Sequence, residues 1–167
     1  TIKKINIPIR EITKDITKNK IIEKVCIINE ELKSKFGLSK PKILICGINP
    51  HAGEDGLLGK EEIDIIIPAV KSLKKIGVAI DGPVPADTAF IKKLVSKYDV
   101  IHTMYHDQGL PVIKFDDFSR TTNVTLGLPI IRVSVDHGTA TELVGTGKVD
   151  ISSLSLIHIS EPTRPAI

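Results

Sequence analysis

KILICGINPHAGEDG, residues 42–56, is the most informative stretch of the chain. It contains a short run of apolar residues, Ile43 to Cys46, of the kind that forms a strand buried on both faces of a parallel sheet. A Gly-rich loop, Gly47 to Gly59, follows directly. This loop contains His51, so a side chain able to bind a metal is expected immediately after a buried strand.

Helices and further strands are expected on both sides of this stretch. Apolar residues recur at helical spacing from Thr17, a plausible N-cap, to Gly37, which would end the helix. Residues 61–76 favour a helix that Pro68 either kinks or restarts. The other expected elements are a strand at 78–80, a loop at 81–87, a helix at 87–98, a strand at 99–104, a loop at 105–109, β-rich runs at 110–115, 123–127 and 129–135, and a loop at 136–147 that opens a short helix. Strands alternating with helices predict an α/β fold with a largely parallel sheet.

Length and composition are those of one globular domain. The chain has 167 residues, 41% of them hydrophobic and 26% charged, and a formal net charge of +3. It has no Trp and only 4% aromatic residues, so it lacks the side chains of a stacking platform for single-stranded nucleic acid. Its basic opening is typical of a solvated helix face. No nucleic-acid partner is expected.

The sequence also gives no sign of a membrane or secreted protein. No apolar run reaches the roughly 18 residues that a membrane span needs, and the opening TIKKINIPIR lacks a signal-peptide core. Cys26 and Cys46 lie in apolar runs without CxxC spacing and are expected to be buried free thiols. We therefore expect a cytoplasmic protein with no membrane partner. The absence of an initiating Met leads us to expect a piece of a longer chain.

Histidines are concentrated in loops that follow expected strands. His51, His106 and His137 lie in NPHAGEDG, YHDQGLP and VDHGTA. Such loops meet at the carboxyl edge of a parallel sheet, where ligands bind in open α/β folds. Three convergent imidazoles favour a metal or ligand site, and ordinary capping is the alternative for each of them. His102 lies within an expected strand and is interpreted as a packed core residue.

Two cations lie in or beside apolar runs. Lys114 stands in PVIKF and Arg132 in PIIRVSV, where a positive charge is costly unless it meets an anion. A phosphate or carboxylate substrate is one such anion, and the guanidinium fork suits it. The alternative is a structural ion pair with a neighbouring carboxylate: Asp116, Asp117 or Asp136.

Four longer segments resemble one family. They are KILICGINPHAGEDGLLGKEEIDIIIPAV, DGPVPADTAF, YHDQGLPVIKF and NVTLGLPIIRVSVDHGTATELVGTGKVD, and they are similar to 4-hydroxythreonine-4-phosphate dehydrogenases of vitamin B6 biosynthesis. The resemblance runs from about residue 5 to residue 150 and covers the second half of the family's chain. It implies the isocitrate/isopropylmalate dehydrogenase-like α/β fold, with α/β/α layers around a largely parallel sheet. It also implies a homodimer with the site at the subunit interface.

The resemblance divides the chain into two parts. Residues 1–154 are expected to form the carboxyl-terminal portion of one dehydrogenase subunit. Residues 155–167 contain LIHISEPTRP, which resembles the translated read-through of a sequencing adaptor. We expect this tail to be non-native.

The implied activity is an oxidation that depends on NAD and on a divalent metal. The substrate would be 4-phosphooxy-L-threonine, and decarboxylation would then give 3-amino-2-oxopropyl phosphate on the route to pyridoxal 5'-phosphate. Zn²⁺, Co²⁺ or Mg²⁺ would serve as the Lewis acid. The runner-up is a paralogue that oxidises 4-phosphoerythronate or 4-phosphothreonate, since these share the terminal phosphate and the vicinal hydroxyl. A non-catalytic fragment that only folds or binds is the alternative from another class.

The resemblance also implies roles for individual residues. His51 and His106 match metal-binding histidines, and Asn6 in KINIPIR stands where the family has a third. An amide oxygen is a poorer transition-metal ligand than imidazole, so this fragment by itself is expected to be inactive. The other implied roles are substrate binding by Lys114, Asn123 and Arg132, catalytic assistance by Asp87 and Asp107 in orienting ligands or moving protons, and NAD binding by His137, Gly138, Thr139, Ala140 and Gly145.

Overall fold

The computed structural model of the chain describes residues 7–117, 121–135 and 145–146. The chain forms two compact units, Thr1–Leu110 and Pro111–Ile167, and each is considered by itself. Within the described residues, no helix combines the length and the apolar character that crossing a membrane requires.

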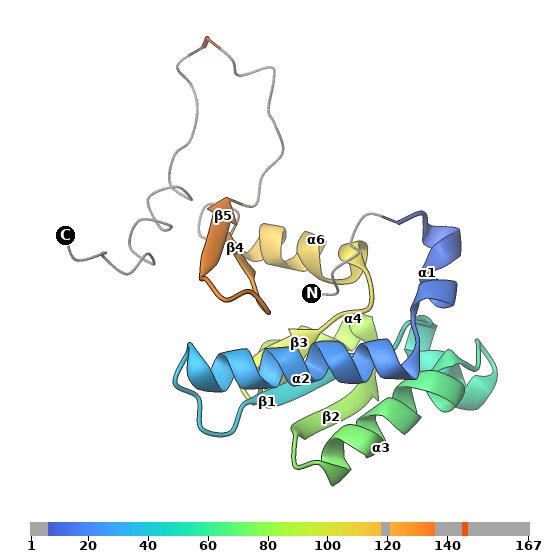
Figure 1. The fold of residues 1–167 in the computed structure, drawn as a ribbon. Coiled ribbons are helices and arrows are strands. Elements are labelled where there is room, and N and C mark those ends of the chain that lie inside the picture. The colour runs from blue at the N-terminus through green and yellow to red at the C-terminus, as the bar shows by residue number, and fades with distance from the viewer. Residues whose placement is uncertain (1–6, 118–120, 136–144, 147–167) are drawn as a thin grey trace. The chain divides into compact units, whose positions relative to one another are not determined.

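Most of the elements belong to the first unit (Figure 1). In chain order they are α1 (Ile9–Asp15), α2 (Lys18–Ser34), β1 (Lys42–Cys46), η1 (Pro50–Gly56), η2 (Glu62–Ile66), α3 (Ile67–Lys75), β2 (Ala79–Val84), α4 (Ala86–Ala89), α5 (Lys92–Val95) and β3 (Val100–His102). Helix α6 (His106–Asp117) begins in the first unit and ends in the second. The second unit contains β4 (Thr122–Thr125) and β5 (Arg132–Val135), which pair antiparallel.

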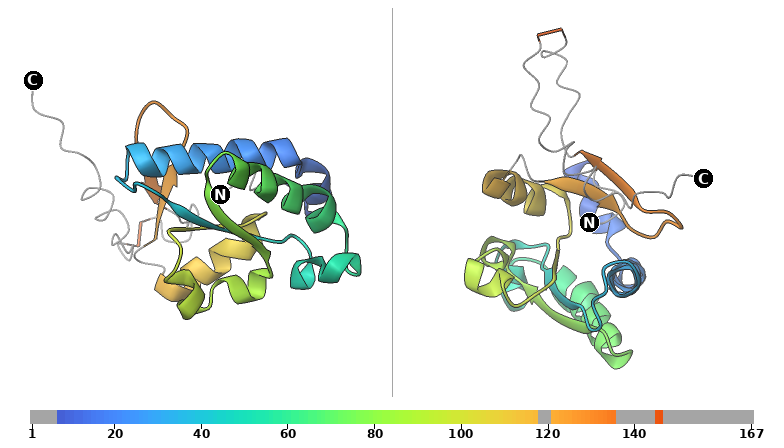
Figure 2. Two further views of the ribbon diagram at one scale, coloured as in Figure 1. Left: turned by 90° about the horizontal axis from the view of Figure 1, so that it is seen from below. Right: turned by 90° about the vertical axis from the view of Figure 1, so that its left-hand side faces the viewer.

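The first unit is built on a parallel sheet with the strand order β2-β1-β3. Helices α2 and α3 lie on one side of the strands, and α4 and α5 lie on the other (Figure 2). On the second side, Leu44 and Cys46 of β1 form a buried cluster with Ala89. The predicted α/β class and the α/β/α layering are therefore confirmed for this unit.

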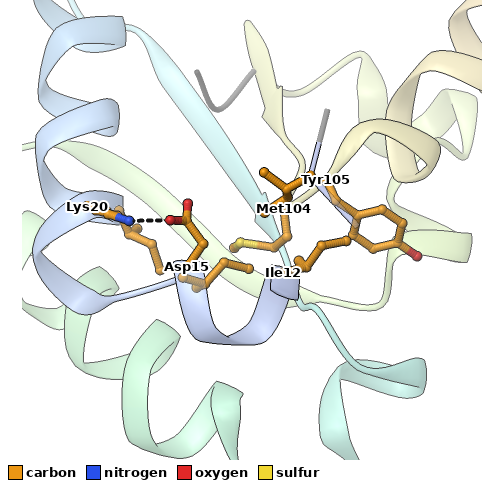
Figure 3. Close-up of a pocket in the computed structure, with 8 residues that line it drawn as sticks. Ile12, Asp15, Lys20, Met104 and Tyr105 are labelled. Atoms are coloured by element: carbon orange, nitrogen blue, oxygen red, sulfur yellow. Dashed lines mark hydrogen bonds and ion pairs between the residues drawn. The ribbon is translucent and has the colours of Figure 1, made fainter. Parts of the chain in front are cut away.

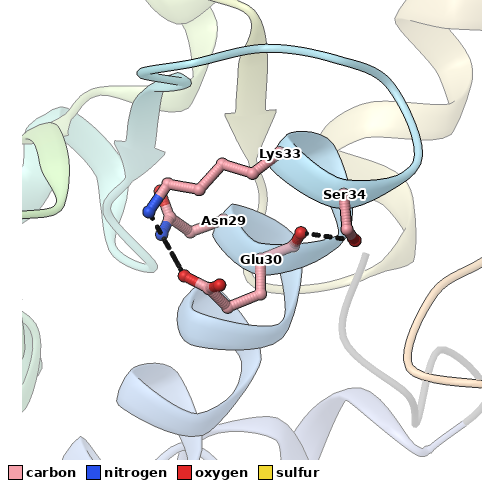
Figure 4. A network of polar contacts seen from close by, with 4 residues as sticks. All are labelled: Asn29, Glu30, Lys33 and Ser34. Atoms are coloured by element: carbon pink, nitrogen blue, oxygen red, sulfur yellow. Dashed lines mark hydrogen bonds and ion pairs between the residues drawn. The ribbon is translucent and has the colours of Figure 1, made fainter.

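Helix α2 follows its sequence pattern closely. Thr17 is the N-cap, and its hydroxyl accepts a hydrogen bond from the backbone N–H of Lys20. The buried face presents Ile21, Val25 and Ile28 to the core. At the other end the polar groups gather around Glu30, which accepts hydrogen bonds from Asn29 and Lys33 through Oε1 and from Ser34 through its carbonyl oxygen (Figure 4).

The buried positions agree largely with the sequence interpretation. The ring of His102 is fully buried at the end of β3, as expected of a core histidine. Both cysteines are free thiols: Cys46 is buried, whereas Cys26 is only half-buried. Burial raises the pKa of the Cys46 thiol to about 11, as expected for an inert core thiol.

Residues 110–115 are helical, and the prediction of a β-rich run there is wrong. They belong to α6, which tolerates Pro111 in its interior. The helix begins at His106, directly after the loop that follows β3. Gly109 allows this first part of the helix to approach Thr103, since a Cβ at position 109 would lie 3.2 Å from the Thr103 side chain.

The loop expected at 105–109 is also wrong from His106 onward, since α6 begins there, and other boundaries differ from the predictions. Strand β2 continues through residues 81–84, where a loop was expected. Glycine at position 82 permits this, since the backbone there passes so close to Ile45 of β1 that a Cβ would clash with the carbonyl oxygen of Ile45. The helix expected at 87–98 is divided into α4 and α5 at Ile91, whose backbone is extended (ψ 127°). Ile91 is exposed in this conformation.

Candidate functional site

The segment after β1 folds into a left-handed turn that includes His51. Five consecutive residues, His51 to Asp55, have positive φ values of 52, 53, 84, 41 and 53°. Gly53 adopts this conformation readily, but each of the other four residues is disfavoured by about 1–2 kcal/mol. Such a turn persists only where its surroundings determine it. The turn leaves His51 exposed beyond the carboxyl end of β1.

A buried carboxylate, that of Glu62, holds the base of this turn. Its Oε1 accepts hydrogen bonds from the backbone N–H groups of Ile48 (2.7 Å) and Asn49 (2.9 Å). Its Oε2 accepts a third from Nδ2 of Asn49 (2.8 Å). The same Nδ2 donates to Glu61 (2.7 Å), and this hydrogen bond holds the pKa of Glu61 below its ordinary value. The backbone just before His51 is thereby fixed.

His106 begins α6, in the segment that follows β3. Its Nδ1 lies 2.6 Å from Oδ1 of Asp107. Because a carboxylate oxygen only accepts hydrogen bonds, the ring donates from Nδ1, and Nε2 of the neutral ring keeps its lone pair. Metal-binding histidines typically have such a partner on the second ring nitrogen. The contact is compatible with the orienting role that the sequence suggests for Asp107.

Gln108 ties the two histidine segments together. It is buried, its Oε1 accepts a hydrogen bond from the backbone N–H of Met104 (2.8 Å), and its Nε2 donates to the carbonyl oxygen of Gly47 (2.8 Å). Gly47 follows β1 and Met104 follows β3, and these strands are neighbours in the sheet. Gln108 therefore joins the loops that lead to His51 and His106 at the carboxyl edge.

A cavity of about 20 Å³ lies between residues 7–21, which include α1, and the segment after β3. Its lining includes Ile7, which follows Asn6 in the sequence, and Tyr105, which precedes His106. Figure 3 shows Met104 and Tyr105 facing α1 across this space. The cavity has room for about one water molecule, so it is not a substrate pocket. It does show that Ile7 and Tyr105 line the same space in the fold.

The remaining predicted site residues of the described chain lie on separate elements. Asp87 is exposed on α4, which packs against η1. In the second unit, Lys114 is half-buried on α6, while Asn123 on β4 and Arg132 on β5 are exposed. Nη1 of Arg132 donates to the hydroxyl of Thr125, its register partner across the strand pair (3.0 Å).

Gly145 is a predicted position that the structure describes, and it lies in a turn with a φ of 76°. The predicted positions outside the described residues are Asn6, His137, Gly138, Thr139 and Ala140. Their proposed roles remain predictions.

A divalent metal fits the described residues in part. Within residues 7–117, 121–135 and 145–146, no group of three or more His, Cys, Asp or Glu side chains is placed to hold a metal ion. His51 and His106 offer two imidazoles in segments that follow neighbouring strands. A zinc site normally has at least three protein ligands, and the third expected position, Asn6, lies outside the described residues.

Sequence reasoning does not find Glu62 or Gln108. Gln108 stands inside YHDQG beside two predicted residues, and its place in that motif is the available signal. Glu62 is one of two adjacent glutamates, and nothing in the sequence tells which of them is buried. The glycines at positions 47 and 53 are related to the burial of Glu62. In the structure, a Cβ at Gly47 or Gly53 would lie 2.9 or 2.7 Å from the Glu62 carboxylate.

These observations define the class of protein as an α/β/α protein with a candidate ligand site at the carboxyl edge of a parallel sheet. Comparison with known proteins then gives the family. The family model described as "Pyridoxal phosphate biosynthetic protein PdxA" matches residues 4–156. The chain belongs to this family.

Individual relatives agree with this assignment. A 4-hydroxythreonine-4-phosphate dehydrogenase from Shewanella frigidimarina is 55% identical over 150 residues, which is 90% of this chain and 46% of that protein. The crystal structure of the Klebsiella pneumoniae enzyme of the same name has a TM-score of 0.81 at 39% identity, covering 92% of this chain and 46% of that one. A terephthalate 1,2-cis-dihydrodiol dehydrogenase from Burkholderia xenovorans has a TM-score of 0.71 at 29% identity, covering 92% and 49%.

The comparisons confirm the fold and show how long the chain is relative to its relatives. The chain has the isocitrate/isopropylmalate dehydrogenase-like fold of its structural neighbours. It spans about half the length of the curated relatives that it matches.

Proposed function

We propose that this chain supplies the carboxyl-terminal half of a 4-hydroxythreonine-4-phosphate dehydrogenase, an oxidoreductase of pyridoxal phosphate biosynthesis. One observation carries the proposal. In a chain that matches the family over residues 4–156, His51 and His106 follow adjacent parallel strands, and Gln108 joins the segments that carry them. The rest of the active site would come from other parts of the complete enzyme, which would act as a homodimer in the cytoplasm.

His51 and His106 would hold a divalent metal: Zn²⁺, Co²⁺ or Mg²⁺. When bound, the metal would supply Lewis acidity at the substrate hydroxyl, and NAD would supply the hydride acceptor for the oxidation at C3. Asp107 would keep the His106 ring oriented through its 2.6 Å contact with Nδ1. Asp87, exposed on the helix that packs against η1, would take up the hydroxyl proton.

Cationic and amide side chains would bind the substrate, 4-phosphooxy-L-threonine. Lys114 and Arg132 suit its phosphate and carboxylate groups, and Asn123 can donate or accept a hydrogen bond. Oxidation at C3 gives a β-keto acid, which loses CO₂ and takes up a proton at C2 to form 3-amino-2-oxopropyl phosphate. The NAD would lie against a segment formed by His137, Gly138, Thr139, Ala140 and Gly145.

A hybrid subunit tests the proposal directly. Residues 4–156 of this chain would replace the matching segment of the Shewanella frigidimarina enzyme, in one form that retains Asn6 and in a second that carries Asn6→His. NADH formation would be followed by absorbance with 4-phosphooxy-L-threonine, 4-phosphoerythronate and 4-phosphothreonate, with and without a chelator. The unaltered Shewanella enzyme is the control for the assay.

The hybrid with the Asn6→His substitution is expected to oxidise 4-phosphooxy-L-threonine in a metal-dependent manner. The hybrid that retains Asn6 is expected to be at least about tenfold slower, because an amide is the weaker ligand. A preference for a phosphorylated sugar acid would replace the proposed substrate with that of the paralogue. A folded hybrid that oxidises none of the three would support the non-catalytic alternative.

A further inference from the structure

Glu62 is buried in an unusual setting for a carboxylate. It is 2% exposed, and its three hydrogen-bond donors are neutral groups: two backbone N–H groups and the Asn49 amide. Burying a charge is costly unless hydrogen bonds compensate it. All three donors belong to residues 48–49, which only Pro50 separates from the left-handed turn that begins at His51.

Two glycines, one before the turn and one within it, also lie close to this carboxylate. A Cβ at Gly47 would lie 2.9 Å from Oε1 of Glu62, and one at Gly53 would lie 2.7 Å from Oε2. The Gly47 Cβ would in addition lie 3.0 Å from Ala52 of the turn. Glycine is therefore required at both positions if the backbone is to approach Glu62 this closely.

The helix that carries Glu62 is irregular at the same place. Glu62 is the first residue of η2, a π-helical segment that ends before α3. Single π-helical turns inside helices occur frequently at functional sites. Here the irregular turn delivers one glutamate of an adjacent pair into the interior, while Glu61 remains partly exposed and contacts only the Asn49 side chain among these groups.

We infer that Glu62 is a positioning residue for His51. It acts through the backbone of residues 48–49, holding the left-handed turn in place so that the imidazole stands at the carboxyl edge of the sheet. The inference rests on the proposed function, in which His51 binds the metal. It predicts that the affinity for metal depends on Glu62, although Glu62 is not itself a ligand.

Substitution of Glu62 by an isosteric amide tests this inference. In Glu62→Gln the carboxamide has only one acceptor oxygen, so its NH₂ group must face one of the present donors. Glu61→Gln is the matched control, since it makes the same chemical change at the neighbouring residue and leaves the hydrogen bonds to Ile48 N and Asn49 N intact. Gly47→Ala is a second probe, which disturbs the contact from the backbone side.

Two measurements are made on each variant of the 167-residue chain. Hydrogen exchange at the amides of Ile48 and Asn49, followed by NMR, reports the turn itself. Titration with Zn²⁺ against a chromophoric chelator, at a temperature where the variant is folded by circular dichroism, reports the consequence for the site. We expect Glu62→Gln and Gly47→Ala to exchange these amides at least tenfold faster and to bind Zn²⁺ at least about tenfold more weakly, the range for residues that orient ligands.

The outcomes separate positioning from simple stabilisation. A residue that only stabilised the fold would lower the melting temperature and leave the affinity of the folded chain unchanged, and that result would overturn the inference. Unchanged amide exchange in Glu62→Gln would overturn it as well, as would equal effects of Glu61→Gln. If the unaltered chain binds no Zn²⁺, the same titration is made on the hybrid subunit that carries Asn6→His, and amide exchange in the chain still decides whether Glu62 holds the turn.

Discussion

The imidazole ring of His102 is fully buried at the end of β3. Neither ring nitrogen is hydrogen-bonded by any residue within the described ranges, and burial lowers the pKa of the ring to about 3. An unfolded chain has a histidine pKa of about 6.5. As the pH falls below about 6.5, the unfolded state therefore takes up a proton that the folded state does not, and the folded chain loses stability.

Replacing His102 should remove this pH dependence. We expect His102→Leu to raise the free energy of unfolding at pH 7 by about 1–2 kcal/mol, since it removes buried polar atoms that lack partners. Between pH 6 and pH 5 the unaltered chain should lose about 1.2 kcal/mol more than the variant. Urea denaturation at both pH values measures this difference. Parallel pH profiles for the two proteins would contradict the assignment of a neutral, buried ring.

Gln108 is expected to matter for stability as well as for the site. Gln108→Ala leaves the Met104 N–H and the Gly47 carbonyl without their buried partner, and each unsatisfied group costs about 1–3 kcal/mol. We predict a loss of about 3 kcal/mol in the free energy of unfolding, measured in urea. The control is Ser96→Ala, which removes one exposed hydroxyl contact and should change stability by less than about 0.5 kcal/mol. A loss below about 1 kcal/mol for Gln108→Ala would mean that water replaces the side chain.

The site residues differ in how far the sequence reveals them. His51 and His106 can be found because each follows a strand and the topology of a parallel sheet brings such loops together. The role of Glu62 cannot be found in this way, because it depends on a left-handed turn. Four of the five residues of that turn disfavour the left-handed conformation, so the sequence does not predict it. Gln108 bonds to Gly47, 61 positions away in the sequence.

Among the elements, α3 offers the clearest test of packing. Leu73 is fully buried on this helix, which packs against both α2 and β2. We expect Leu73→Ala to lower the free energy of unfolding by about 2–5 kcal/mol, because it removes buried methyl groups and leaves a cavity. Ile76→Ala, next to the end of the same helix, removes a side chain that is 65% exposed and should cost less than about 0.5 kcal/mol. Equal losses measured in urea would contradict the packing described for α3.

Elements with one dominant signal could be predicted, and ambiguous ones could not. The run Ile43 to Cys46 and the helical spacing after Thr17 each agree with a single structure, and both elements form as expected. Residues 110–115 contain a short apolar run whose period fits a strand or a buried helix equally well. The contacts of Gln108 and Gly109 favour the helix there, and both involve residues before the run.

At the scale of the whole molecule, the chain spans about half the length of the relatives that it matches. It matches 90% of its own length to about 46% of theirs. The two imidazoles at the carboxyl edge are therefore expected to act together with groups from the rest of a complete subunit. Asn6 is the position within this chain that bears most directly on that expectation, since the family resemblance assigns a histidine there.

The zinc affinity of the hybrid subunit tests the central claim most directly. We predict that Asn6→His binds Zn²⁺ at least about tenfold more tightly than the Asn6 form, because imidazole is the better ligand. In the Asn6→His background, His51→Ala and His106→Ala should each weaken Zn²⁺ binding at least tenfold. Loss of a residue that only orients a ligand already weakens metal binding about tenfold or more, and loss of a ligand should cost at least as much. Chelator competition measures all four proteins under the same conditions. If both alanine variants bind Zn²⁺ as tightly as their parent, the two histidines do not form the metal site and the account is wrong.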